Sequence, residues 1–160
     1  MEPATLGQEF HNPDDSSLRS LLGAVRSIAV VGIKASAEDD AFRVPRYMQA
    51  HGYRIVPVNP KLDRVLGETA VPILTEISEP VDLVNLFRSN PHIPAHVDEI
   101  LALPTLPRAA WMQLGIRHDA ESQRLRRAGI TVVQNLCLMV EHGRLLGGNL
   151  AVDPTAIRTR

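Results

Sequence analysis

The apolar run Ser27-Ile28-Ala29-Val30-Val31, closed by Gly32, constrains the fold of this chain more than any other stretch. Its small and β-branched residues show no polar alternation, which is typical of a strand buried on both faces of a parallel sheet. Gly32 allows a sharp turn, and a polar loop follows over 33–42. A helix is predicted over 44–51, and Gly52 ends it. Strand, glycine turn and helix in this order form the first unit of a doubly wound sheet.

Four further segments have the length and composition of strands, namely 53–58, 81–87, 109–113 and 130–133. Pro57 cannot donate a ladder hydrogen bond, so the strand that contains it is predicted near an edge. Strands that alternate with helices imply right-handed crossovers and a parallel sheet. We therefore predict one Rossmann-like α/β domain over 1–160, with a core at about 15–146. Its doubly wound parallel sheet has five strands and carries helices on both faces.

Three finer expectations concern the ends of elements. Pro45 is expected in the first turn of helix 44–51, where a missing N–H removes no helix hydrogen bond. Asp119 is expected to be the N-cap of the helix that follows the fourth strand. Residues 1–13 are expected to form a loose lead-in and 149–160 a mostly polar tail.

Composition excludes several classes of protein. Of the 160 residues, 44% are hydrophobic and 22% charged, as in an ordinary globular domain, and the net charge of −1 favours neither nucleic acid nor an anionic membrane as a partner. No apolar run is long enough to span a bilayer, and no signal-peptide pattern opens the chain. The single Cys137 cannot form an internal disulfide, which fits a reducing compartment. We expect a cytoplasmic protein; a protein partner is possible.

Ligands of doubly wound sheets bind at the carboxyl ends of the strands. The loops at this edge are 32–43, 59–61, 87–91, 113–118 and 134–137. The first loop has neither the G-x-G-x-x-G nor the G-x-x-x-x-G-K-[ST] pattern, but Lys34 and Ser36 could contact a phosphate, and Lys61 could reach the same pocket. Equally, Lys34 could be a solvated charge and Ser36 a turn-stabilising hydroxyl. The run Glu38-Asp39-Asp40 would repel an anion unless it faces outward.

Catalytic and metal-binding groups are scarce. Cys137 lies in an apolar run and is predicted to be a buried structural thiol rather than a nucleophile. His118 is the one titratable base in the predicted edge loops, with no hydroxyl or thiol beside it in sequence. His92 and His96 have helical i, i+4 spacing, but Pro94 lies between them at a predicted helix start. We predict neither catalytic nor metal-binding residues.

A series of short motifs runs in one order along the chain, with a Gly-Tyr pair, a Pro-Val-Asn-Pro turn, a Phe-Arg pair and a Trp-x-Gln-x-Gly segment at its centre. The residues that carry it are Val30-Val31-Gly32, Ser36, Arg43-Val44, Tyr47, His51-Gly52-Tyr53, Val58-Asn59-Pro60, Gly67, Val81-Asp82, Phe87-Arg88, Trp111, Gln113, Gly115-Ile116, Ala128-Gly129, Val132-Val133 and Cys137-Leu138. Over about 15–146 the chain resembles the small stand-alone CoA-binding proteins of bacteria and archaea. Those are similar in fold to the CoA-binding domain of the succinyl-CoA synthetase α-subunit.

The resemblance implies non-catalytic binding of coenzyme A or an acyl-CoA by the loops at the strand ends. The positions it assigns to the ligand are Gly32, Lys34, Ala35 and Ser36 at the phosphates, Asn59, Pro60 and Lys61 at the second turn, Phe87 and Arg88 at the crevice wall, and Gln113, Leu114 and Gly115 along the ligand. It implies no enzyme activity, because the histidine of the synthetases lies in a further domain.

Two alternatives remain open. A nicotinamide-dependent oxidoreductase could use the same fold, but it requires the missing glycines and an acidic residue where Asn59 stands. A protein-interaction module that has lost CoA binding would equally lack catalytic groups. The acidic run Glu38-Asp39-Asp40 stands where the family usually has a Lys or Arg and a Pro, a departure from the family pattern at the first loop.

Overall fold

Five parallel strands form one sheet in the order β2-β1-β5-β6-β7 in the computed structural model, which describes residues 10–147. The strands are β1 (Ser27–Val31), β2 (Arg54–Val58), β5 (Leu83–Leu86), β6 (Ala109–Met112) and β7 (Thr131–Val133). The order and direction confirm the predicted Rossmann-like α/β fold. β2 is an edge strand, as Pro57 predicted.

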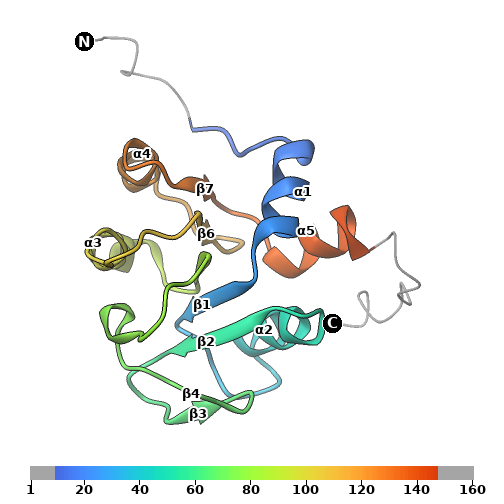
Figure 1. Ribbon diagram of the computed structural model, residues 1–160, viewed down its shortest axis with the longest axis vertical. Coiled ribbons are helices and arrows are strands. Elements are labelled where there is room, and N and C mark those ends of the chain that lie inside the picture. The colour runs from blue at the N-terminus through green and yellow to red at the C-terminus, as the bar shows by residue number, and fades with distance from the viewer. Residues whose placement is uncertain (1–9, 148–160) are drawn as a thin grey trace.

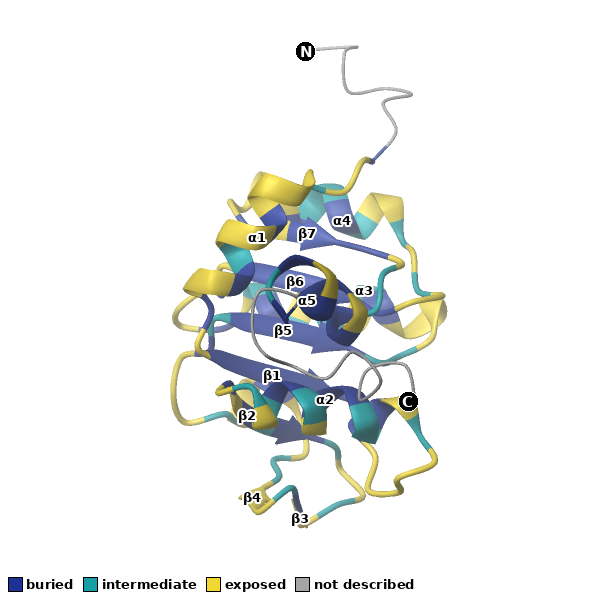
Figure 2. Ribbon diagram, turned by 90° about the vertical axis from the view of Figure 1, so that its right-hand side faces the viewer, coloured by how far each residue is buried: buried dark blue, intermediate teal, exposed yellow. Residues whose placement is uncertain are grey.

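Helices cover both faces of this sheet (Figures 1 and 2). One face carries α1 (Asp15–Ala24), α2 (Asp40–Ala50) and α5 (Leu138–Leu145); the other carries α3 (Ile93–Leu101) and α4 (Asp119–Arg127). Between β2 and β5 the chain forms the small antiparallel pair β3 (Arg64–Val65) and β4 (Glu68–Thr69) and the 3₁₀ turn η2 (Leu74–Glu76). A second 3₁₀ turn, η3 (Asn90–His92), leads into α3.

β1 lies at the point where the strand order reverses. All five of its residues are buried, and it pairs with β2 on one side and β5 on the other. Val31, the last residue of β1, stands opposite Val58 and Leu86. In doubly wound sheets this switch point opens a crevice at the carboxyl ends of the strands, so the fold directs a ligand to the loops after β1, β2 and β5.

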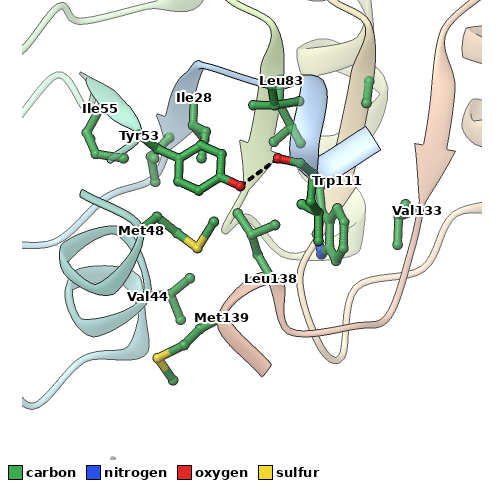
Figure 3. Packing of buried hydrophobic residues seen from close by; sticks show 14 of the residues in the cluster. Ile28, Val44, Met48, Tyr53, Ile55, Leu83, Trp111, Val133, Leu138 and Met139 are labelled. Carbon is green, nitrogen blue, oxygen red and sulfur yellow. Dashed lines mark hydrogen bonds between the residues drawn. The ribbon is translucent and has the colours of Figure 1, made fainter. Parts of the chain in front are cut away.

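The face under α1, α2 and α5 holds an apolar core that includes polar anchors. Trp111 is fully buried, and its indole Nε1 donates to the Leu136 carbonyl at 2.8 Å. The Tyr53 hydroxyl donates to the Leu22 carbonyl at 2.6 Å (Figure 3). These bonds satisfy the polar ends of large aromatic side chains and hold α1 and the segment before α5 against the sheet.

α2 begins earlier than expected, at Asp40, so the prediction for Pro45 is wrong: it is buried inside the helix. A proline there leaves the carbonyl four residues earlier, that of Ala41, without its helical donor. The Lys34 N–H supplies one at 3.2 Å. The first loop is thereby bonded to the helix that follows it, which is why the helix tolerates the proline.

Two predictions about element ends also need correction. The N-cap of α4 is His118, whose Nδ1 accepts the Glu121 N–H at 3.4 Å, because the Asp119 carboxylate is bonded instead to Gln134 Nε2 at 2.6 Å.

Residues 10–13 are not a loose lead-in. Phe10 is buried, the Asn12 side-chain amide donates to the Gln134 carbonyl at 2.9 Å, and its oxygen accepts the Gln134 N–H at 2.8 Å. The remaining lead-in and the predicted tail, 149–160, lie outside the described residues.

None of the helices within 10–147 is both long and apolar enough to cross a membrane.

Candidate functional site

A cavity of about 340 Å³ opens where the loops after β1, β2 and β5 meet, and we call it the larger cavity. Its polar and turn residues are Gly32, Lys34, Asn59, Pro60, Lys61, Phe87, Arg88, His96 and Glu99, and its apolar wall is Val31, Val58, Pro72 and Ile73. Seven of the twelve predicted ligand positions therefore meet around one space. The cavity lies at the switch point of the sheet, where the fold directs a ligand.

A second cavity of about 290 Å³ adjoins it, and we call it the smaller cavity. It is lined by Asp40, Phe87, Arg88, Ser89, Gln113, Leu114, Ile116 and Cys137. Phe87 and Arg88 line both spaces, so the two cavities share a wall at the end of β5. Their linings together include residues from the first loop to Cys137, the residue before α5.

Gly32 is required by packing at this wall. Its φ is 86°, and a Cβ built on it would lie 2.5 Å from the Phe87 carbonyl oxygen. The Gly32 N–H donates to the Val58 carbonyl at 3.0 Å, and the Phe87 N–H donates to the Val31 carbonyl at 2.9 Å. The glycine thus lets the first loop pass directly against the end of β5, and a side chain at this position would separate the two.

Arg88 is a half-buried cation whose charge no carboxylate balances. Its Nε is buried without a hydrogen-bond partner, and no ion pair of Arg88 is found within residues 10–147. Lys34 and Lys61 add two exposed ammonium groups at the larger cavity. Three cations, one of them with a buried donor that has no partner, thus face the cavity against the single carboxylate of Glu99, an arrangement that favours an anion.

Asn59 joins the first two loops. Its Nδ2 donates to the Ile33 carbonyl at 2.7 Å, and its Oδ1 accepts the Lys61 N–H at 2.8 Å. The amide is thus engaged within the fold and positions the backbone on which Lys34 and Lys61 are carried.

Three predicted ligand residues line neither cavity. Ala35 and Ser36 lie outside them, and Ser36 Oγ accepts the Glu38 N–H at 3.3 Å, which is the turn-stabilising alternative. Gly115 donates its N–H to Asn135 Oδ1 at 2.7 Å. Gln113 lines the smaller cavity, but its Oε1 accepts the Leu138 N–H at 2.8 Å and so anchors α5.

Only one carboxylate of the acidic run reaches a cavity. Asp40 lines the smaller one and forms an ion pair with Arg43, whose other terminal nitrogen donates to the Ala37 carbonyl at 2.7 Å. Glu38 is exposed and lines neither space. Arg43 therefore offsets the carboxylate closest to the site.

The predicted ligand positions did not include six lining residues of the larger cavity, namely Val31, Val58, Pro72, Ile73, His96 and Glu99. His96 Nδ1 lies 3.1 Å from Glu99 Oε1, a pair that i, i+3 spacing could have indicated. That this pair faces the loops after β1 and β2 depends on how α3 packs, and no local pattern contains that information.

The prediction that Cys137 is buried needs correction, whereas its role as a structural thiol rather than a nucleophile stays a prediction. The residue is half-buried and lines the smaller cavity. Leu138 belongs to the buried core, and Cys137, one residue before the first residue of α5, packs against the same core with part of its surface exposed. His118 lines neither cavity, and its ring caps α4.

The structure is a small Rossmann-like α/β domain with a cavity at the switch point of its sheet, and Lys34, Lys61 and Arg88 belong to the lining of that cavity. The sequence profile of the CoA binding domain family matches residues 26–143, and the chain belongs to that family. The protein YneT of Bacillus subtilis (strain 168) is 37% identical over 133 residues, which is 83% of this chain and 97% of that protein.

Two solved structures show how closely the architecture is shared. One from Thermus thermophilus is 42% identical with a TM-score of 0.79, and the match covers 84% of this chain and 100% of that chain. A protein from Pyrococcus horikoshii OT3 is 31% identical with a TM-score of 0.80, covering 88% and 99%. The resemblance stated from short motifs is thus confirmed at the level of the whole domain.

Proposed function

We propose that this protein binds coenzyme A or an acyl-CoA reversibly across the two adjoining cavities and catalyses no turnover of it. The observation that carries the proposal is Arg88, an unbalanced half-buried guanidinium on the wall that both cavities share. A phosphate group would supply the missing counter-charge and accept its hydrogen bonds.

The shape of the site supports an extended ligand. Coenzyme A carries its phosphates at one end and a long arm with a thiol at the other, and the two cavities provide about 340 and 290 Å³ in sequence. Lys34 and Lys61 lie at the larger cavity, so we assign the phosphate end to it. Membership of the CoA binding domain family supports the same class of ligand.

The absence of turnover is proposed from the disposition of the reactive groups. Transfer or hydrolysis of an acyl group needs a nucleophile beside a base and donors for the oxyanion. Among the described residues, Cys137 lines the smaller cavity and His96 the larger, where its Nδ1 is bonded to Glu99. The smaller cavity also contains the carboxylate of Asp40, but that group is ion-paired with Arg43, and no hydrogen bond from it to Cys137 or Ser89 is found within residues 10–147.

Calorimetric titration with CoA tests the proposal. Arg88→Met should weaken CoA about ten- to a hundredfold, because the variant loses a charge-assisted contact but keeps much of the apolar stem. Arg127→Met is the matched control: this arginine is exposed on α4, away from both cavities, and its loss should leave the affinity unchanged.

Three results would contradict the proposal, two of them its ligand and one its lack of turnover. Tighter binding of NADH than of CoA would favour the oxidoreductase alternative. If the folded wild type binds neither CoA nor NADH, the remaining alternative is a protein-interaction module that has lost CoA binding. Thiol release from acetyl-CoA above the buffer rate would overturn the non-catalytic part alone.

A further inference from the structure

The smaller cavity contains the chain's only cysteine, and the fold holds that residue from both sides. Trp111 Nε1 donates to the carbonyl of Leu136, the residue before Cys137, at 2.8 Å. Gln113 Oε1 accepts the N–H of Leu138, the residue after it, at 2.8 Å. Both anchors come from the β6 side of the sheet and are themselves buried. Cys137 is therefore presented to the cavity at a defined place, not on a free loop.

An independent observation indicates that this end of the site accepts a polar ligand. Arg88 lines the smaller cavity as well as the larger one, and its buried Nε has no partner. Asn85 is fully buried, and neither its Oδ1 nor its Nδ2 is hydrogen-bonded. Buried amides with two unmet atoms are rare in native proteins.

The position of Asn85 connects it to Cys137. Side chains alternate along a strand, so Asn85 lies on the same face of β5 as Phe87, which lines both cavities. Its partner in register on β6 is Trp111, the residue that holds the segment before Cys137. Asn85 itself lines neither cavity, so its unmet amide belongs to the interior beneath this segment, and Arg88 is the group with an unmet donor that faces the cavities.

We propose that Cys137 forms a mixed disulfide with the thiol of coenzyme A bound in the two cavities, which makes it a redox modification site. The inference rests on the proposed function, because the phosphate end must lie at Lys34 and Lys61 for the thiol end to reach the smaller cavity. The arm then passes Phe87 and Arg88, the two residues that line both spaces.

The co-reactant is a disulfide of the same ligand, CoA disulfide. The Cys137 thiolate attacks one of its sulfurs, a new S–S bond joins Cys137 Sγ to that CoA, and the original S–S bond breaks. The second CoA leaves as a thiolate and takes up a proton. The disulfide is the oxidant, and a reducing thiol reverses the step.

Intact-protein mass spectrometry of wild type incubated with CoA disulfide tests the inference. We expect an adduct of one CoA per chain, absent in Cys137→Ser and removed by dithiothreitol. Glutathione disulfide is the matched reagent without the nucleotide, and CoA disulfide should react at least about tenfold faster because binding places its sulfur beside the thiol. Arg88→Met should bring the two rates closer together.

No adduct on the folded protein, or equal rates with the two disulfides, would overturn the inference. Calorimetry with reduced CoA in dithiothreitol separates this failure from failure of the proposed function. If reduced CoA binds and no adduct forms, only the inference about Cys137 is wrong. If reduced CoA does not bind, both proposals are wrong.

Discussion

The two cavities differ in how far their residues are committed to the fold. At the larger cavity, the exposed Lys34 and Lys61 supply charge, and no side-chain bond of either is found within 10–147. At the smaller cavity, Gln113 anchors α5 and Asp40 pairs with Arg43. Binding and stability should therefore be separable at the two lysines of the larger cavity, whereas Asn59 in the same lining and Gln113 at the smaller cavity are bonded within the fold and should affect both. Arg88 lines both cavities, and Gly32 lies directly against Phe87, the other residue that they share.

Gly32→Ala should have the largest effect. The added Cβ meets the Phe87 carbonyl at 2.5 Å, and φ is 86°, so we expect a loss of about 2–4 kcal/mol in the free energy of unfolding together with loss of CoA binding. Urea denaturation measures it. Gly23→Ala in α1, where a Cβ meets nothing within 4 Å, is the control and should not destabilise. If the two variants change the free energy of unfolding equally, the contact between Gly32 and Phe87 is not tightly packed.

Acid should destabilise the protein through His142 in α5, which lines neither cavity. His142 is 4% exposed beside His51, and burial, followed by repulsion from His51, lowers its pKa to about 4 from 6.5. Between these values the unfolded chain binds more protons, so the free energy of unfolding should fall by about 1–3 kcal/mol as the pH drops from 6.5 to 4. His142→Phe should flatten this dependence, whereas His92→Gln, at an exposed position, should not.

Gln113→Leu should reduce stability by about 1–2 kcal/mol, because the buried Leu138 N–H loses its acceptor. CoA binding should weaken in parallel, since α5 and Cys137 shift with it. Thermal denaturation and calorimetry on the same variant measure the two effects. Normal stability with weakened binding would show that Gln113 contacts the ligand directly, and the contrast between the cavities would be wrong.

Lys34→Ala and Lys61→Ala should each weaken CoA by about 0.5–1 kcal/mol without lowering the thermal midpoint, because both side chains are exposed. Raising the salt concentration should weaken the wild type and narrow its difference from each variant. Calorimetry at low and high salt checks both statements. If the affinity for CoA does not change with salt concentration, the phosphates of the ligand do not bind at these lysines.

The course of the backbone was largely predictable. The unalternating run that ends at Gly32 predicted a buried strand, and the proline of β2 predicted an edge strand. Both predictions use residue properties that the sequence contains, namely hydrophobicity and the capacity to donate a hydrogen bond. The interior position of Pro45 was not predictable. It depends on the Ala41 carbonyl finding a donor in Lys34, a contact that the first loop makes only in the folded chain.

The sequence by itself determined the class of fold, the family and the edge of the sheet at which a ligand would bind. Hydrophobic periodicity, turn residues and the order of short motifs can all be read along the chain without knowledge of tertiary contacts. Only the tertiary structure brought Glu99 and His96 from α3 to that edge, left Arg88 without a counter-charge between two cavities and moved Cys137 from an expected core position to a cavity wall. These outcomes depend on how helices pack over a twisted sheet, and packing is decided by the sum of contacts between segments distant in sequence.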